Sequence, residues 1–332
     1  MLALVTGSTG FLGSHLCQAL LESGYRVRAF HRPSSALTLL EGLDVEYAVG
    51  DITQPATLEK AMLGVEAVFH TAGQVSYWRD SQLMYKITVG GTRNVLEAAE
   101  TAGVQRVVYT SSVAALGVPE AAHVEGQSPP MIDENHTWNY RPAWWRYGHA
   151  KHLAEMEVQR AVAQGLDVVI TNPSIIFGPR DTNLTSGELV VQIAQGWGRF
   201  TIEGGMNVVH AADVARGHLY ALKRGRTGER YILGGMNLPI EHLFRIIAEV
   251  ADVPPASFKL PNILAHAMAP AFDLAKRLGI SPYNGELLRL VGRFPYYDTS
   301  KAEMDLGFTW ASSPREMIQE TYDWYQERGI LS

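Results

Sequence analysis

Cysteine is nearly absent from this chain of 332 residues, because Cys17 is its only one. A single cysteine excludes an intrachain disulfide and a metal site built from several cysteines. His149 and His152 lie three residues apart in a helical pattern, but no neighbouring cysteine or carboxylate completes a metal site with them, so we expect no bound metal. The lack of disulfides is typical of a reducing compartment, and we expect a cytoplasmic protein.

An excess of positive charge is missing as well. The chain has 28 lysines and arginines against 34 aspartates and glutamates, for a formal net charge of -6. This balance argues against a nucleic-acid partner and favours small molecules. Long hydrophobic runs are also lacking: the run at 2–5 meets a glycine at once, and residues 261–280 are interrupted by charged residues and a proline. We therefore expect no leader and no membrane span, and a soluble protein.

The sequence does contain a regular alternation of short apolar runs and longer helical patterns. Runs rich in β-branched residues, separated by helices, are typical of βαβ units with a buried parallel sheet. Right-handed crossovers then predict a doubly wound α/β sheet of the Rossmann type, with helices on both faces. The predicted strands are 2–6, 26–30, 45–49, 67–71, 106–111 and 167–171, and the predicted helices between them are 11–23, 57–63, 81–102 and 144–164.

A glycine-rich turn follows the first predicted strand and opens the first predicted helix. Its glycines allow a tight turn, the close approach of a pyrophosphate, and close packing of helix on sheet. The start of the helix then offers free N–H groups and a partial positive charge to the phosphates. This context favours a dinucleotide site over a tight turn without a ligand. The expected cofactor-binding residues of the turn are Gly7, Ser8, Thr9, Gly10, Phe11, Leu12 and Gly13.

The second predicted strand indicates which dinucleotide is bound. NAD enzymes usually end this strand with a carboxylate that holds the ribose 2′-hydroxyl, and residues 27–34 contain none. Arg32 instead offers a planar guanidinium to a 2′-phosphate, to which Arg28 or a following serine can add; a solvated surface arginine is the alternative. We expect NADP(H), with NAD as the second possibility. Asp51 and Ile52 at the third strand tip, and Thr71, Ala72 and Gly73 at the fourth, are expected to line the cofactor.

A tyrosine and a lysine stand four residues apart, at Tyr147 and Lys151, which puts both on one face of a predicted helix. A free tyrosine has a pKa of about 10, and a neighbouring lysine with a positively charged nicotinamide favours its phenolate form. Alone, such a pair is more often a surface coincidence. Ser112, after the fifth predicted strand, can hydrogen-bond a substrate oxygen or cap a turn. The glycine turn, Ser112 and the Tyr147/Lys151 pair nevertheless follow one another in an order that coincidence rarely produces, which makes Ser112, Tyr147 and Lys151 the candidate catalytic residues.

After residue 179 helical patterns are separated by loops rich in glycine and proline. We expect residues 1–178, with a return segment at about 208–234, to form the Rossmann domain. Residues 179–207 and 235–332 are expected to form a smaller, mostly helical substrate-binding lobe across the strand tips. After residue 179 the predicted helices are 187–196, 212–224, 241–251, 264–278 and 313–326, and one more strand is predicted at 229–233; the second helix and this strand lie in the return segment.

Further motifs strengthen this interpretation. They are Gly50-Asp51-Ile52, His70-Thr71-Ala72-Gly73, Gly91-Thr92-Arg93-Asn94, Thr110-Ser111-Ser112, Asn172-Pro173-Ser174 and Gly178-Pro179-Arg180. Together with the glycine turn and the Tyr147/Lys151 pair, they make nearly the whole chain resemble the extended short-chain dehydrogenase/reductase family, also called the NAD-dependent epimerase/dehydratase family. Within it the sequence looks most like the dihydroflavonol-4-reductase-like branch, which includes hopanoid-associated sugar epimerase-like proteins.

The resemblance implies roles for individual residues. Tyr147 is the acid/base, Lys151 binds the nicotinamide ribose and lowers the tyrosine pKa, and Ser112 orients the reacting oxygen. The resemblance also implies a homodimer formed through the helices at 81–102 and 144–164. The remaining cofactor neighbours that it implies are Thr110, Ser111, Pro173 and Ser174.

Two positions depart from the family pattern. Thr88 stands where the family often has an asparagine, and Met206 stands about where nucleotide-sugar members often carry an arginine. The missing guanidinium weakens the case for a diphosphate substrate, although Arg199, Arg289 or Arg293 can substitute for it. The loop at 117–143 and the residues after it carry Trp138, Tyr140, Trp144 and Trp145, which either form an aromatic rim for an apolar carbonyl substrate or only pack the loop.

Three functions remain open at this stage. The leading one is a reductase that transfers hydride to a small-molecule ketone or aldehyde, with Tyr147 as the proton donor. The alternative is an NAD-dependent nucleotide-sugar epimerase or dehydratase. The third is a catalytically silent NADP-binding redox sensor, which has no need of Tyr147 and Lys151 together.

Overall fold

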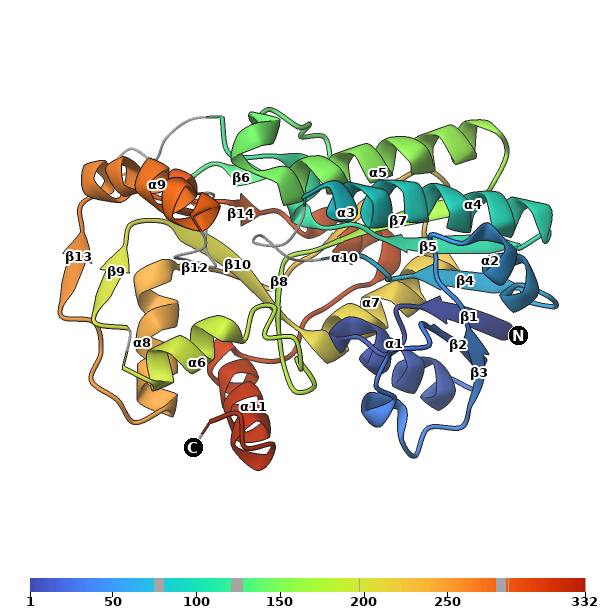
Figure 1. Ribbon diagram of the computed structural model, residues 1–332, viewed down its shortest axis with the longest axis horizontal. Coiled ribbons are helices and arrows are strands. Elements are labelled where there is room, and N and C mark those ends of the chain that lie inside the picture. The colour runs from blue at the N-terminus through green and yellow to red at the C-terminus, as the bar shows by residue number, and fades with distance from the viewer. Residues whose placement is uncertain (75–80, 121–127, 197, 279–284, 286, 332) are drawn as a thin grey trace.

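A seven-stranded parallel sheet forms the centre of the computed structural model, which describes all residues except 75–80, 121–127, 197, 279–284, 286 and 332 (Figure 1). Its order is β11 (Arg230–Leu233), β7 (Val168–Pro173), β5 (Arg106–Thr110), β4 (Ala67–His70), β1 (Leu2–Thr6), β2 (Arg26–His31) and β3 (Val45–Val49). The order reverses between β1 and β4, which is where doubly wound sheets bind their ligands. The predicted fold class is confirmed, and each predicted strand lies within two residues of its observed bounds.

Helices cover both faces of this sheet (Figure 1). Side chains alternate along β1, so that Val5 belongs to the hydrophobic cluster on one face and Leu4 to the cluster on the other. The helices α1 (Phe11–Glu22) and α7 (Ala211–Arg224) pack against each other on the first face. The other face is covered by α2 (Pro55–Ala61), α4 (Gly91–Thr101) and α5 (Arg146–Ala163).

The helix predicted at 81–102 is interrupted. It consists of α3 (Ser81–Tyr85), a π-helical turn (Lys86–Gly90) and α4. In this turn Thr88 is buried, and its carbonyl oxygen accepts a 2.6 Å hydrogen bond from the Thr92 hydroxyl. The periodicity of apolar residues does not reveal such a turn, because one extra residue per turn changes the helix only locally.

Short strands outside the central sheet were not predicted from the sequence. A three-stranded sheet joins β12 (Met236–Pro239), β10 (Gly205–His210) and β8 (Ile175–Phe177), and two-stranded pairs join β13 (Phe258–Leu260) to β9 (Phe200–Ile202) and β14 (Tyr296–Tyr297) to β6 (Met131–Ile132). Apart from β10, these strands have only two to four residues, too few for a clear alternation. The helices predicted at 187–196, 241–251, 264–278 and 313–326 correspond to α6 (Glu188–Ala194), α8 (Ile240–Val250), α9 (Asn262–Arg277) and α11 (Pro314–Glu327).

The helix α10 (Ser300–Leu306) was not predicted, and it contacts α7 and β11. Short 3-10 helices lie at Thr38–Leu40, Val113–Leu116, Pro142–Trp144 and Leu287–Leu290. Over the described part of the chain, no helix is both long enough and apolar enough to cross a membrane.

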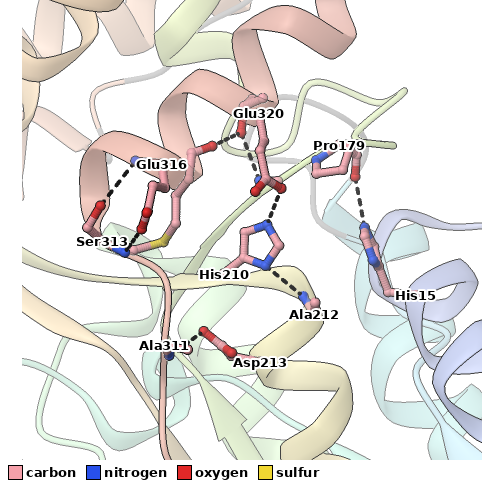
Figure 2. Close-up of polar contacts among 12 residues, drawn as sticks. His15, Pro179, His210, Ala212, Asp213, Ala311, Ser313, Glu316 and Glu320 are labelled. Carbon is pink, nitrogen blue, oxygen red and sulfur yellow. Dashed lines mark hydrogen bonds and ion pairs between the residues drawn. The ribbon is translucent and has the colours of Figure 1, made fainter.

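Polar contacts around the start of α7 join segments that are distant in the sequence (Figure 2). The Nδ1 atom of His210 accepts the backbone N–H of Ala212 at 3.2 Å, so its Nε2–H donates to Glu320 of α11 at 3.1 Å. Nearby, the imidazole of His15 on α1 bonds the carbonyl oxygen of Pro179 at 2.9 Å. These contacts connect α11 to the start of α7, and the segment at Pro179 to α1, the helix that follows the glycine turn.

Candidate active site

The glycine turn has the backbone form that a pyrophosphate site requires. Gly7 has φ +70°, and a Cβ there would lie 2.8 Å from the backbone nitrogen of Ala72. A Cβ on Gly13 would lie 2.1 Å from the carbonyl oxygen of Gly7, so only glycine allows α1 to start this close to β1. Within the described chain no side chain caps α1 at Gly10, which leaves the first N–H groups of the helix available to an anion.

The neighbouring strand tips hold this turn in place. The Ser8 hydroxyl donates to the carbonyl oxygen of Phe30 at the end of β2 at 3.1 Å. From the tip of β4, the Thr71 hydroxyl donates to the Thr6 carbonyl oxygen at 2.7 Å, and the N–H of Ala72 to the Thr6 hydroxyl at 3.3 Å. The turn is therefore fixed by β2 and β4, the neighbours of β1 in the sheet.

The arginines of β2 differ in their surroundings. Arg32 is exposed directly after the strand. Arg28 pairs with Glu46 at 3.0 Å and donates to the carbonyl oxygens of Ala61 and Leu63, each at 2.7 Å. The expectation that Arg28 adds to a 2′-phosphate site is therefore wrong, because its guanidinium is held against the end of α2.

The tip of β3 is also ordered by internal contacts. The Asp51 carboxylate accepts the N–H and the hydroxyl of Thr53, both at 2.8 Å. Ile52 is buried, and its carbonyl oxygen accepts a 2.9 Å hydrogen bond from the Asn94 amide of α4. A cofactor at this tip would thus meet a preformed loop.

Tyr147 and Lys151 are both buried on α5, with exposed fractions of 8% and 4%. Lys151 Nζ donates to the carbonyl oxygen of Thr110 at the tip of β5 at 2.9 Å. A Cβ on Gly73 would lie 3.4 Å from that same nitrogen, so the ammonium lies between the tips of β4 and β5. The predicted pair therefore faces the sheet edge rather than bulk solvent.

Burial dominates the ionisation of this pair. It raises the pKa of Tyr147 to about 12, although a hydrogen bond with the Ser112 hydroxyl acts in the opposite direction. It also lowers the pKa of Lys151 to about 8, against the attraction of the Glu155 carboxylate. Burial thus favours the protonated phenol at neutral pH.

Ser112 combines the two roles considered for it. Its hydroxyl oxygen accepts the N–H of Ala114 at 3.2 Å, which caps the 3-10 helix that follows β5. The same hydroxyl forms a hydrogen bond with Tyr147.

Pro173 ends β7, which lies on the side of β5 opposite to β4. Ser174 follows it and is buried, and its hydroxyl has no hydrogen-bond partner among the described residues.

The aromatic residues in and after the loop at 117–143 mostly pack against neighbouring side chains. Trp138 stacks on His152 of α5 with ring centroids 6.0 Å apart. The guanidinium of Arg293 lies 5.5 Å from the ring of Tyr140, and that of Arg289 lies 6.0 Å from the ring of Trp144. These rings support the packing interpretation of the loop.

Two of the arginines considered as substitutes at a diphosphate site are already engaged. Arg289 forms an ion pair with Asp273, and Arg293 donates to the Pro119 carbonyl oxygen at 3.0 Å. Met206 lies in β10 and pairs with Leu238 of β12.

Among the described residues, no group of three or more His, Cys, Asp or Glu side chains is arranged to hold a metal ion.

Sequence reasoning missed a buried polar layer behind the pair. Glu155 lies one helical turn beyond Lys151 and is 1% exposed. It contacts Asn172 of β7 at 2.7 Å and Arg230 of β11 at 3.0 Å. The spacing of four from Lys151 was the signal available, since it places a carboxylate on the same helix face.

Comparison with known proteins assigns the class. The model of the NAD dependent epimerase/dehydratase family matches residues 3–234, so the chain belongs to this family, that of the extended short-chain dehydrogenases/reductases. Its members are NAD(P)-dependent enzymes, and this chain is accordingly an NAD(P)-dependent oxidoreductase of that class.

Individual relatives cover the whole chain. It is 35% identical to a protein of Synechocystis sp. named "Putative dihydroflavonol 4-reductase", over 98% of this chain and 95% of that one. It is 33% identical to "Sterol demethylase protein B" of Methylococcus capsulatus, over 100% of both chains. Among solved structures, a nucleoside-diphosphate-sugar epimerase from Pseudomonas aeruginosa superimposes with a TM-score of 0.81 at 29% identity, over 100% of this chain and 99% of that one.

Proposed function

We propose that this protein is an NADP(H)-dependent reductase of a ketone or aldehyde, with Tyr147 as the proton donor. The observation that carries the proposal is the burial of Tyr147 and Lys151 on one face of α5, with the Ser112 hydroxyl bonded to the phenol. A protonated phenol at neutral pH is the form that a proton donor needs. The bound cofactor supplies a hydride to the carbonyl carbon.

The protein's own groups complete this reaction. Ser112 holds the carbonyl oxygen of the substrate, and Tyr147 transfers its phenolic proton to that oxygen as the alcohol forms. The nearby ammonium of Lys151 then stabilises the phenolate that is left, until a proton from solvent restores it. A buried site strengthens these interactions, because they act in a low dielectric.

The fit to a dinucleotide is supported by the turn, where side chains on Gly7 or Gly13 would occupy the space that the backbone uses. NADP(H) is favoured over NAD by the exposed Arg32 and by the lack of a carboxylate at the end of β2. In the proposal Gly7 to Gly13 bind the pyrophosphate, and Arg32 binds the 2′-phosphate. Asp51, Ile52, Thr71 to Gly73, Thr110, Ser111, Pro173 and Ser174 line the rest of the cofactor.

A small carbonyl compound is the proposed substrate. The relative at 35% identity carries the name of a reductase. Of the arginines considered for binding a diphosphate, Arg289 pairs with Asp273 and Arg293 donates to the carbonyl oxygen of Pro119.

We also propose a homodimer that packs through α4 and α5, and a cytoplasmic location supported by the lone cysteine. Light scattering and cell fractionation test these two points; a monomer, or a protein found outside the cytoplasm, would overturn them.

The second candidate is an NAD-dependent nucleotide-sugar epimerase or dehydratase, favoured by the full-length similarity to an epimerase structure. One experiment separates the two. NADPH is mixed with the protein and a panel of ketones and aldehydes, and its absorbance is followed. Stoichiometric oxidation of NADPH supports the reductase. Cofactor that stays bound through purification without being consumed, together with thermal stabilisation by UDP or dTDP, would favour the epimerase instead.

A further inference from the structure

Glu155 is a buried acid that the proposed reaction does not use. It lies on α5, four residues after Lys151 and eight after Tyr147, and only 1% of its surface is exposed. Burial of a carboxylate is costly unless it is paired and hydrogen-bonded. Its surroundings explain how it is tolerated, and they connect it to the candidate site.

The Glu155 carboxylate contacts polar side chains that come from three neighbouring strands of the sheet. Its Oε1 accepts the Ser111 hydroxyl after β5 at 2.5 Å and the Asn172 amide of β7 at 2.7 Å. Its Oε2 pairs with Arg230 Nε of β11 at 3.0 Å. Ser111 and Asn172 thus donate hydrogen bonds to Oε1, whereas Arg230 meets Oε2 as an ion pair without a hydrogen bond. Burial raises the pKa of the Glu155 carboxyl, and the positive charge of Arg230 and the two hydrogen bonds act in the opposite direction, toward the ionised form.

Arg230 is itself held in place. Its Nη1 donates to the carbonyl oxygens of His136 at 3.1 Å and of Glu134 at 3.5 Å, in the loop before α5. The Glu134 carboxylate in turn accepts the N–H of Ile232 in β11 at 2.8 Å. The ion pair therefore spans α5, β11 and the loop that precedes the candidate proton donor.

Several titratable and charged groups lie around Lys151 and Glu155. Lys151 faces the Thr110 carbonyl oxygen, and its ammonium lies 5.4 Å from the ring of Tyr109. Its positive charge also lowers the pKa of His70 on β4. Burial keeps the pKa of His70 low, at about 3, so this histidine is neutral. The titratable and charged groups around Glu155 are Lys151, Tyr109 and Arg230. The positive charge of Arg230 also lowers the pKa of His152.

We propose that Glu155 is a positioning residue for the candidate site: its negative charge keeps Lys151 in the ammonium form, and its hydrogen bonds fix the ends of β5 and β7 around it. The inference rests on the proposed function, in which the Lys151 ammonium contacts the cofactor. The electrostatics agree with the contacts, because burial lowers the pKa of Lys151 and the Glu155 carboxylate opposes that change.

The test measures the dissociation constant of NADPH between about pH 6.5 and about pH 10 by cofactor fluorescence. In the unmodified protein the affinity falls as Lys151 loses its proton, and Lys151→Met removes this transition. In Glu155→Gln, which keeps the size of the side chain without the charge, we expect the midpoint to move down by about one pH unit. Glu155→Asp keeps the charge and is expected to restore the original midpoint.

Glu157→Gln is the matched control, because Glu157 lies on the same helix but pairs with Arg93 on α4, and its midpoint should match that of the unmodified protein. If Glu155→Gln does not fold, Asn172→Ala removes one donor from the carboxylate and should move the midpoint in the same direction by less. A midpoint unchanged in the folded variant overturns the inference, as does a transition that survives Lys151→Met. Failure of the unmodified protein to bind NADPH would instead overturn the proposed function.

Discussion

The ammonium of Lys151 donates a 2.9 Å hydrogen bond to the carbonyl oxygen of Thr110, which joins the second turn of α5 to the tip of β5. Because Tyr147 lies one turn earlier on the same helix, this bond fixes the side of the helix that faces the sheet edge. The strand that carries Thr110 continues into Ser112, whose hydroxyl bonds Tyr147. One helix face and one strand end thus form the centre of the candidate site.

Replacement of the candidate proton donor should abolish turnover and spare binding. Tyr147→Phe removes only the hydroxyl, so we expect kcat for carbonyl reduction to fall by about 10²- to 10⁴-fold. The dissociation constant of NADPH should change less than about twofold, because the ring remains in place. Stopped-flow absorbance and cofactor fluorescence measure the two quantities. Tyr322→Phe on α11 is the control and should keep full activity; full activity of Tyr147→Phe would refute the assignment.

The choice between the two cofactors should depend on Arg32. Arg32→Ala removes the proposed partner of the 2′-phosphate, and we expect NADPH to bind about 10- to 100-fold more weakly while NADH binds as before. Titration of both cofactors into both proteins checks this. Arg26→Ala is the control, because Arg26 is exposed at the opposite end of β2 and pairs with Glu46. Tighter binding of NADH than NADPH by the unmodified protein would show that Arg32 has no such role.

The glycine turn should not tolerate even one methyl group. Gly13→Ala would place a Cβ 2.1 Å from the carbonyl oxygen of Gly7, so the start of α1 must move away from β1. We expect a loss of about 1–3 kcal/mol in the free energy of unfolding, with weaker NADPH binding. Urea denaturation measures the first effect. Gly90→Ala serves as the control, because a Cβ there meets no atom within 4 Å; equal stability of the two variants would contradict the prediction.

Acid should destabilise the protein through buried histidines. Burial lowers the pKa of His218 from 6.5 to about 4, so the folded protein binds its proton less readily than the unfolded chain. Its contribution is fully present above pH 6.5 and is lost as the pH falls toward 4, by about 1.4 kcal/mol per pH unit.

The effect is measured by urea denaturation at about pH 7 and about pH 5. His218→Gln should lose less stability between these two values than the unmodified protein, by about 1–2 kcal/mol. His242→Gln on α8 is the matched control, because His242 is exposed, and it should leave the pH dependence unchanged. The same loss of stability in His218→Gln as in the unmodified protein would mean that His218 does not carry the effect.

Much of the fold was predictable because its signals are local. β-branched runs between helical patterns indicated the parallel sheet, and the strand β1 was predicted with its observed bounds. The short strand β10 was not predicted, since its pairing with β8 and β12 depends on contacts distant in sequence. The π-helical turn that contains Thr88 was missed for a related reason, because the helical periodicity continues on both sides of it.

The candidate site divides in the same way. The sequence by itself determined the glycine turn and the Tyr147/Lys151 spacing, because both are patterns within a few residues of one element. Only the tertiary structure decided that Arg28 is held by Glu46 and that Glu155 meets Ser111, Asn172 and Arg230. Those partners come from separate strands, and the order of the strands in the sheet, not their order in the chain, brings them together.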